Sequence, residues 1–241
     1  MTNDQSTTTA PLLFTKPTLL LAEQHSDLGF KAHDNYKYAS NTNSLPLTIA
    51  EFEKAAISYP IVFTNNDNPT ALAVTGLIAN KNNYVDAEGA WIPGEYIPAY
   101  VRKYPFVFME SDGGEQFSLC IEDEYLVESG GQPIFDNGQP TPEAQKAMDF
   151  CKNFQASWQQ TEQYVKILQE LDLLIDRRAD IETSGGDRLS LDGFCVVDRD
   201  KFGKLPKSAV NELPRDLVAA ITCHFVSMSC WAKLLMIGEK S

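Results

Sequence analysis

The chain has 241 residues, a mass of 26.8 kDa and a formal net charge of −13, with 43% apolar and 22% charged residues. This composition is typical of a soluble globular protein that is large enough to bury a substantial core. The negative charge argues against binding to nucleic acid or to an anionic bilayer, since both would repel such a surface.

The N-terminal segment, residues 1–24, is expected to be partly disordered, because its opening run MTNDQSTTTA has little to bury. It shows no secretion signal, since a basic region is missing and the apolar run Leu19–Ala22 is too short. The most apolar stretch, residues 217–232, contains His224 and is too short to cross a bilayer, so no transmembrane segment is predicted. The scattered cysteines form no CxxC motif, which predicts reduced thiols and a cytoplasmic location: Cys120, Cys151, Cys195, Cys223 and Cys230.

A capping box marks the first predicted helix, with Thr48 as its N-cap and Glu51 three residues later. This helix should end near Ser58, because Pro60 disfavours the helical conformation of the residue before it. Strands are predicted next at residues 61–63 and 71–79, and residues 83–91 should form a short strand with a turn at Glu88-Gly89.

The run EYIPAYVRKYPFVF, residues 95–108, repeats the order of EFEKAAISYPIVF, residues 51–63. Each has a glutamate next to an aromatic residue, then a short helix, a Tyr-Pro pair and an apolar strand. Pro98 suits the first turn of the second helix, and Pro105 should end it. Either a helix-to-strand corner is used twice, or a segment has been duplicated.

The second half of the chain continues the mixed pattern. A hairpin is predicted around a turn at residues 111–114, followed by a surface loop over residues 124–140. Thr141 and Pro142 should open the longest helix. A second hairpin around residues 184–187 and a buried C-terminal helix over residues 215–237 complete the chain. The predicted fold class is α+β, with mostly antiparallel strands and hairpins packed with one long central helix and a buried C-terminal helix.

Most catalytic motifs are missing. No dinucleotide-binding, P-loop, nucleophile-elbow or zinc-protease motif occurs. The run DRDKFG, residues 198–203, begins like a calcium loop, but Phe202 and Ala209 stand where ligands are needed. His25 and His33 do not match a usual zinc spacing, so neither a metal nor a cofactor is predicted.

Aromatic residues and an arginine gather in the stretch WIPGEYIPAYVRKYPFVF, residues 91–108. Tyr, Trp and Arg are the types enriched at binding hot spots, and prolines limit the backbone entropy lost on docking. The predicted binding residues are Trp91, Tyr96, Tyr100 and Arg102. The alternative is that the tyrosines pack against the sheet and that Arg102 pairs with a nearby carboxylate.

Several segments together resemble the SapC family of bacterial proteins: NSLPLTIAEFEKAAISYPIVF, NYVDAEGAW, YIPAYVRKYPFVF, SLCIED, PIFDNGQPT and GFCVVD. The resemblance covers nearly the whole chain and implies a single SapC-like domain over residues 25–241. The family name comes from an association with a paracrystalline bacterial surface layer and with serum resistance. It has no agreed set of catalytic or ligand-binding residues, so the resemblance carries no site residues over.

Two functions follow as hypotheses. The first is a non-catalytic binding or accessory protein of this family, which serves a bacterial surface-layer or uptake system and binds a protein or small-molecule partner. The second is an enzyme whose cleft uses carboxylates such as Asp86 or Asp123 with Tyr100 and Arg102. The missing catalytic motifs favour the first.

Overall fold

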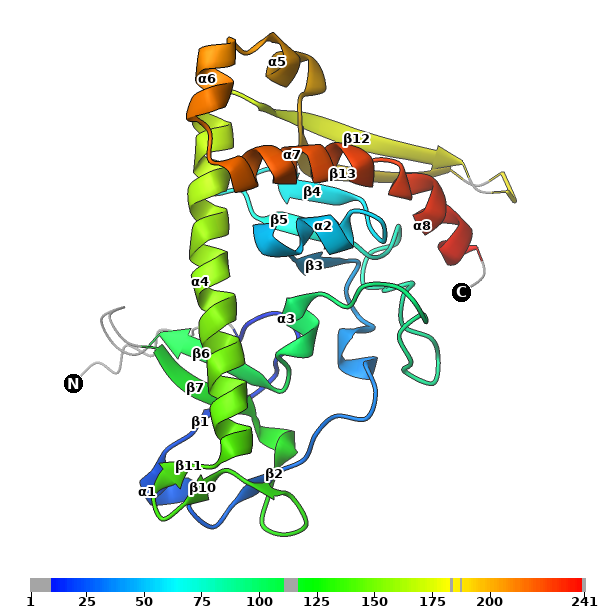
Figure 1. Cartoon of the computed structure of the whole chain (residues 1–241). Coiled ribbons are helices and arrows are strands. Elements are labelled where there is room, and N and C mark those ends of the chain that lie inside the picture. The colour runs from blue at the N-terminus through cyan, green and yellow to red at the C-terminus, as the bar shows by residue number, and fades with distance from the viewer. Residues whose placement is uncertain (1–9, 111–116, 183, 187, 240–241) are drawn as a thin grey trace, which may run out of the picture. The chain divides into compact units, whose positions relative to one another are not determined.

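The computed structural model describes residues 10–110, 117–182, 184–186 and 188–239 (Figure 1). The chain divides into two compact units, and each is described by itself. Unit 1 comprises residues 1–34 and 103–153, and unit 2 comprises residues 35–102 and 154–241. A division into compact units does not test independent folding, so the single domain over residues 25–241 stays a prediction.

Unit 1 is built from short antiparallel strands. Its three-stranded sheet has the order β1-β7-β6, and Gly29–Phe30 (β2) lies between β8 and β9 in a second sheet. The other strands are Pro17–Leu19 (β1), Phe106–Glu110 (β6), Phe117–Glu122 (β7), Leu126–Val127 (β8), Gln132–Pro133 (β9), Phe135–Asp136 (β10) and Gln139–Pro140 (β11). Its short helices are Ala22–His25 (α1) and Asp123–Tyr125 (η3).

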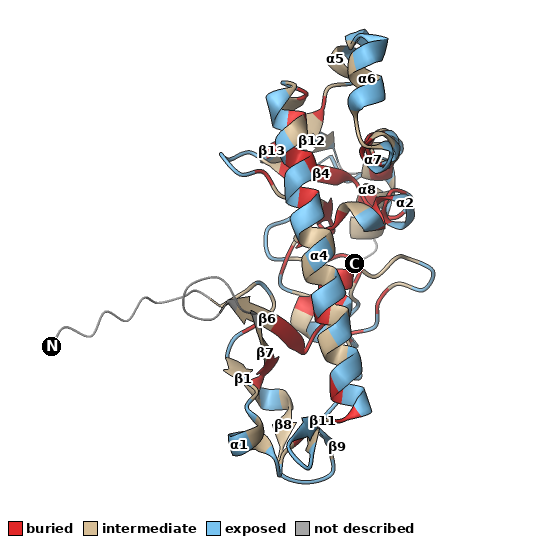
Figure 2. Ribbon diagram, turned by 60° about the vertical axis from the view of Figure 1, so that its left-hand side comes forward, coloured by how far each residue is buried: buried red, intermediate tan, exposed pale blue. Residues whose placement is uncertain are grey.

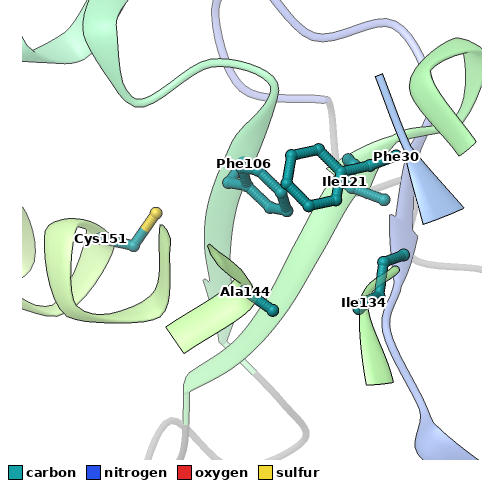
Figure 3. Close-up of a cluster of buried hydrophobic side chains, with 6 residues drawn as sticks. All are labelled: Phe30, Phe106, Ile121, Ile134, Ala144 and Cys151. Carbon is teal, nitrogen blue, oxygen red and sulfur yellow. The ribbon is translucent and has the colours of Figure 1, made fainter. Parts of the chain in front are cut away.

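A small apolar core holds unit 1 together. The ring of Phe30 meets that of Phe106 edge to face at a centroid distance of 5.0 Å. Figure 3 shows this cluster, which contains Phe30, Phe106, Ile121, Ile134, Ala144 and Cys151. The last two come from the first turns of the long helix Pro142–Glu170 (α4), so this helix supplies one wall of the core.

Unit 2 contains a five-stranded antiparallel sheet with the order β12-β13-β4-β5-β3. Its strands are Ser44–Pro46 (β3), Ile61–Thr64 (β4), Ala71–Val74 (β5), Leu174–Glu182 (β12) and Arg188–Val197 (β13). Its helices, besides the later turns of α4, are Lys37–Ala39 (η1), Ile49–Glu51 (η2), Phe52–Ala55 (α2), Ala99–Arg102 (α3), Arg199–Lys204 (α5), Lys207–Glu212 (α6), Arg215–Ser227 (α7) and Cys230–Gly238 (α8).

Helix α7 lies against β4, β13 and α2. The first three residues of β4 are buried, and Figure 2 shows this strand in the colour of buried residues. Val165 and Leu168 of α4 face Phe63 of β4 and Leu217 of α7, so sheet and helices share one core.

The fold class predicted from the sequence is confirmed, since helices combine with antiparallel sheets. The capping box is also confirmed: the Glu51 carboxylate accepts from the Thr48 backbone N–H at 2.9 Å. Thr141 caps α4, because its hydroxyl accepts from the Ala144 N–H at 3.3 Å. The second hairpin is confirmed as β12–β13, whereas the turn predicted at residues 111–114 lies outside the described residues.

Several predicted boundaries are wrong. The helix predicted up to Ser58 ends at Ala55, and the strand predicted over residues 71–79 ends at Val74. The strand predicted over residues 83–91 is reduced to one bridge between Val85 and Trp91. The loop predicted over residues 124–140 contains the short strands β8 to β11.

The C-terminal helix predicted over residues 215–237 is two helices, α7 and α8, bent by 47°. Two serine hydroxyls account for the break. Ser227 donates to the His224 carbonyl at 2.6 Å and Ser229 to the Val226 carbonyl at 2.8 Å. Such bonds compete with the helical ladder and bend it.

Among the described residues, no single helix has the length and apolar character needed to cross a membrane. Helices α7 and α8 meet the length and composition criteria only when taken together across their bend.

Candidate functional site

The predicted binding residues all lie in unit 2: Tyr100 and Arg102 on α3, Tyr96 just before it, and Trp91 at a bridge with Val85. Pro98 directly precedes this short helix, and its carbonyl accepts from the N–H groups of Val101 and Arg102 at 3.0 and 3.1 Å. Proline is favourable there because its fixed φ suits a helix and its missing N–H is not needed. The sequence thus positions Tyr100 and Arg102 on one helical turn, with Tyr96 preceding it.

A buried carboxylate organises this corner. Glu51 is 5% exposed, and its Oε2 accepts from the Thr48 hydroxyl at 2.8 Å as well as from the Thr48 N–H. Its Oε1 accepts from the Ala99 N–H at 2.6 Å and from the Tyr96 hydroxyl at 3.1 Å. One glutamate therefore caps its own helix and the first turn of α3 together.

Arg102 is exposed and rests on Tyr96. Its Nη2 donates to the Tyr96 hydroxyl oxygen at 3.2 Å, and its Nε donates to the Ile97 carbonyl at 3.0 Å. The guanidinium carbon lies 5.8 Å from the centre of the Tyr96 ring. Burial, with the Glu51 charge as a second cause, raises the pKa of Tyr96 to about 12. The phenol therefore keeps its proton at neutral pH and can donate to Glu51.

The backbone of Tyr96 is held as well. Its N–H donates to the Ser58 hydroxyl at 3.1 Å, and its carbonyl accepts from the Tyr59 hydroxyl. Ser58 and Tyr59 come from the Tyr-Pro corner that follows α2. The two similar corners of the sequence are thereby bonded to each other.

Trp91 and Tyr100 are buried, with 6% and 8% exposure. The Trp91 ring meets Tyr36 edge to face at 5.6 Å, and Tyr100 meets Phe154 of α4 at 5.9 Å. Burial raises the pKa of Tyr100. The expectation that these two residues present an aromatic surface is wrong, because their rings fill the core. Their role in binding stays a prediction.

The carboxylates of the enzyme hypothesis occupy structural positions. Asp86 Oδ1 accepts from the Ala90 N–H at 2.7 Å and closes a turn. Asp123, in unit 1, pairs with Lys16 Nζ at 2.8 Å and accepts from the Thr18 hydroxyl at 2.9 Å. These bonds occupy one oxygen of Asp86 and both oxygens of Asp123.

The calcium-like run forms a helix instead of a loop. Asp198 is the N-cap of α5, and its Oδ1 accepts from the N–H groups of Asp200 and Lys201 at 2.9 and 3.1 Å. No group of three or more histidine, cysteine or acidic residues in the described part of the chain is placed to hold a metal ion.

His224 is a core residue. It is 1% exposed, and its Nε2 accepts from the Val197 N–H at 3.1 Å. Within the described structure, its Nδ1 makes no hydrogen bond. The nearby Ile61 backbone raises the pKa of His224, but this effect is smaller than that of burial. Burial, the largest cause, lowers the pKa of His224 to about 4, so it is neutral at physiological pH.

Comparisons with known proteins identify the family. Neither the curated proteins nor the solved structures gave a match. The sequence model of the SapC family matches residues 20–234, which is nearly the whole chain. The chain therefore belongs to the SapC family.

Proposed function

We propose that this chain is a non-catalytic binding protein with an accessory role, and that its contact surface centres on Arg102 and Tyr96. The observation that carries the proposal is the fixed position of an exposed guanidinium. Arg102 donates to Ile97 and to Tyr96, and Tyr96 in turn donates to the buried carboxylate of Glu51.

This arrangement suits recognition more than chemistry. An arginine that is already oriented loses less side-chain entropy when a partner binds. Its planar fork matches a carboxylate, and the half-buried Tyr96 ring beside it offers an apolar contact. The partner class that fits is a protein surface that presents a carboxylate next to an apolar side chain.

Membership of the SapC family supports a role in a bacterial surface-layer or uptake system. We place the protein in the cytoplasm as part of the proposal, because its cysteines are free thiols, most of them buried. Fractionation of the native bacterium should recover the protein with the cytoplasmic contents. Recovery mainly in the cell envelope would overturn this location.

The experiment is a photo-crosslinking capture in the native bacterium. A photoreactive residue replaces exposed Pro93, close in sequence to Tyr96, in the wild-type and Arg102→Ala backgrounds. Arg178→Ala is the matched control, because Arg178 is also exposed and bonded, to Asp180 at 2.7 Å, but lies on β12.

The proposal predicts one crosslinked protein that appears in the wild type and in the Arg178→Ala background and is lost with Arg102→Ala. A crosslinking pattern that is the same in all three backgrounds would show that Arg102 is not part of a contact surface.

A further inference from the structure

A hollow of about 340 Å³ in unit 2 is separate in its lining from the Arg102 surface. It lies where the loop after β5, the tip of the β12–β13 hairpin and the end of α8 come together (Figure 1). Its apolar lining consists of Leu77, Ile78, Leu189 and Leu235. A volume of this size lies at the lower end of small-molecule sites.

Asn83 supplies a polar group to this lining. The residue is 7% exposed, and its backbone N–H donates to the Thr75 carbonyl at 2.9 Å, which fixes its position in the wall of the hollow. Its side-chain amide can both donate a hydrogen bond to a ligand in the hollow and accept one from it.

Gly238 leaves the amide accessible. A Cβ atom at this position would lie 2.7 Å from Asn83 Nδ2, closer than real contacts allow. Gly238 is the last residue of α8 and does not have a positive φ. Its backbone conformation therefore does not require a glycine. The missing methyl group therefore opens the space beside Asn83.

The hollow also carries one charge of each sign. Lys81 lines it, and across the described residues no carboxylate lies within salt-bridge distance of its ammonium group. The Lys81 backbone is fixed by its close approach to Gly76, where a Cβ would lie 1.8 Å from the Lys81 carbonyl oxygen. Glu239 lines the hollow too, and the Ser184 N–H holds its Oε1 at 2.6 Å.

We propose that this hollow binds a zwitterionic apolar amino acid of about the size of leucine. The ligand carboxylate meets Lys81 and the Asn83 amide, and the ligand ammonium group meets the second oxygen of Glu239. The ligand side chain packs among Leu77, Leu189 and Leu235. Each part of such a ligand has its chemical complement in the lining, whereas a purely anionic ligand would be repelled by Glu239.

The test is calorimetric titration of the full chain with three probes: L-leucine, N-acetyl-leucine and leucinamide. Leucine should bind saturably at one site, and each derivative, which lacks one charge, should bind about tenfold more weakly or worse. Failure of leucine to bind up to its solubility limit would overturn the proposal. If N-acetyl-leucine bound as tightly as leucine, the proposal would also be overturned, because the site would then recognise only a carboxylate, such as a peptide C-terminus.

Two charge variants make the assignment specific. Glu239→Gln keeps the oxygen that accepts from Ser184, and should weaken leucine about tenfold but strengthen N-acetyl-leucine, whose carboxylate is no longer repelled by Glu239. Lys81→Met should weaken leucine and strengthen leucinamide, whose ammonium group is no longer repelled by Lys81. A variant that weakens all three probes equally would contradict the assigned contacts.

Glycine variants provide a matched steric pair. Gly238→Ala should abolish leucine binding, because its methyl group fills the space beside Asn83. Gly203→Ala in α5 is the control, since a Cβ there meets nothing within 4 Å. Circular dichroism confirms that both variants fold. Leucine binding that survives Gly238→Ala in a folded protein would overturn the site.

Discussion

The carboxylate of Glu51 accepts a hydrogen bond of 2.6 Å from the backbone N–H of Ala99, which lies 48 residues further along the chain. The same side chain closes the capping box with Thr48. Two helical corners that resemble each other in sequence are thus joined by one buried acidic group. The corresponding glutamate of the second corner, Glu95, instead pairs with Lys233 of α8 at 2.6 Å.

The first prediction concerns this junction. Glu51→Ala should lower the free energy of unfolding by about 3 kcal/mol or more, because it leaves the buried N–H groups of Thr48 and Ala99 without their acceptor. Urea denaturation measures the loss. Glu53→Ala is the control, since Glu53 is exposed on α2, which directly follows Glu51, and should change stability by less than about 0.5 kcal/mol. Equal effects of the two variants would contradict the role given to Glu51.

A second prediction separates packing from recognition within α3. Tyr100→Ala should destabilise the fold by about 3 kcal/mol, because the ring is buried against Phe154 and its removal leaves a cavity. Arg102→Ala should stay within about 0.5 kcal/mol of the wild type, since Arg102 is exposed. Thermal and urea unfolding of the two variants test this difference. An Arg102 variant that is as unstable as the Tyr100 variant would mean that Arg102 is a structural residue.

His224 should make stability depend on pH. In the unfolded chain the imidazole takes up a proton near its ordinary pKa of 6.5, whereas burial keeps it neutral in the fold down to about pH 4. The unfolded state binds more protons between these values. The free energy of unfolding therefore falls as the pH is lowered through this window, by about 3 kcal/mol in all.

The measurement is urea denaturation from pH 7 to pH 4 for the wild type and for His224→Gln. The variant lacks the titrating group, so its stability should fall less steeply over this range. Identical pH dependence in both proteins would show that His224 does not titrate differently in the fold.

Lys103 in unit 1 gives a prediction at alkaline pH. Its side chain is 6% exposed, and burial lowers the pKa of its ammonium group to about 8 from an ordinary value of 10.5. The unfolded chain binds more protons between these values, so the Lys103 contribution to stability rises as the pH increases through them. Lys103→Met should thus be more stable than the wild type at pH 7, by up to about 3 kcal/mol, and this advantage should shrink toward pH 10.

Parallel denaturation series at pH 7 and above measure the difference between the two proteins. Lys31→Met serves as the control, because Lys31 is exposed. An advantage of Lys103→Met that stays constant with pH would contradict the lowered pKa.

Local signals in the sequence predicted much of the fold. The capping box at Thr48, the N-cap at Thr141 and the helix start at Pro98 depend on neighbours within a few residues, and all three are present. The break between α7 and α8 was missed, because apolar spacing does not show which serine hydroxyls will bond to helical carbonyls.

The site was only partly predictable. Residue type marked Tyr96 and Arg102, and the structure brings them into contact. Residue type also marked Trp91 and Tyr100 as binding residues, but the rings of both are buried. The central role of Glu51 depends on a bond to a residue far along the chain, and such long-range pairing leaves no periodic signal. The only indication was the resemblance between the two corners.

The most direct test of the proposed function is the dissociation constant of the captured partner, measured for purified wild-type protein and three variants. Arg102→Ala should weaken binding about tenfold or more, as expected for a hot-spot arginine. Tyr96→Phe, which removes the hydroxyl that orients the guanidinium, should weaken it to a smaller extent, and Arg178→Ala should leave it unchanged. An Arg102→Ala protein that folds normally and binds with the wild-type dissociation constant would contradict the proposed binding surface.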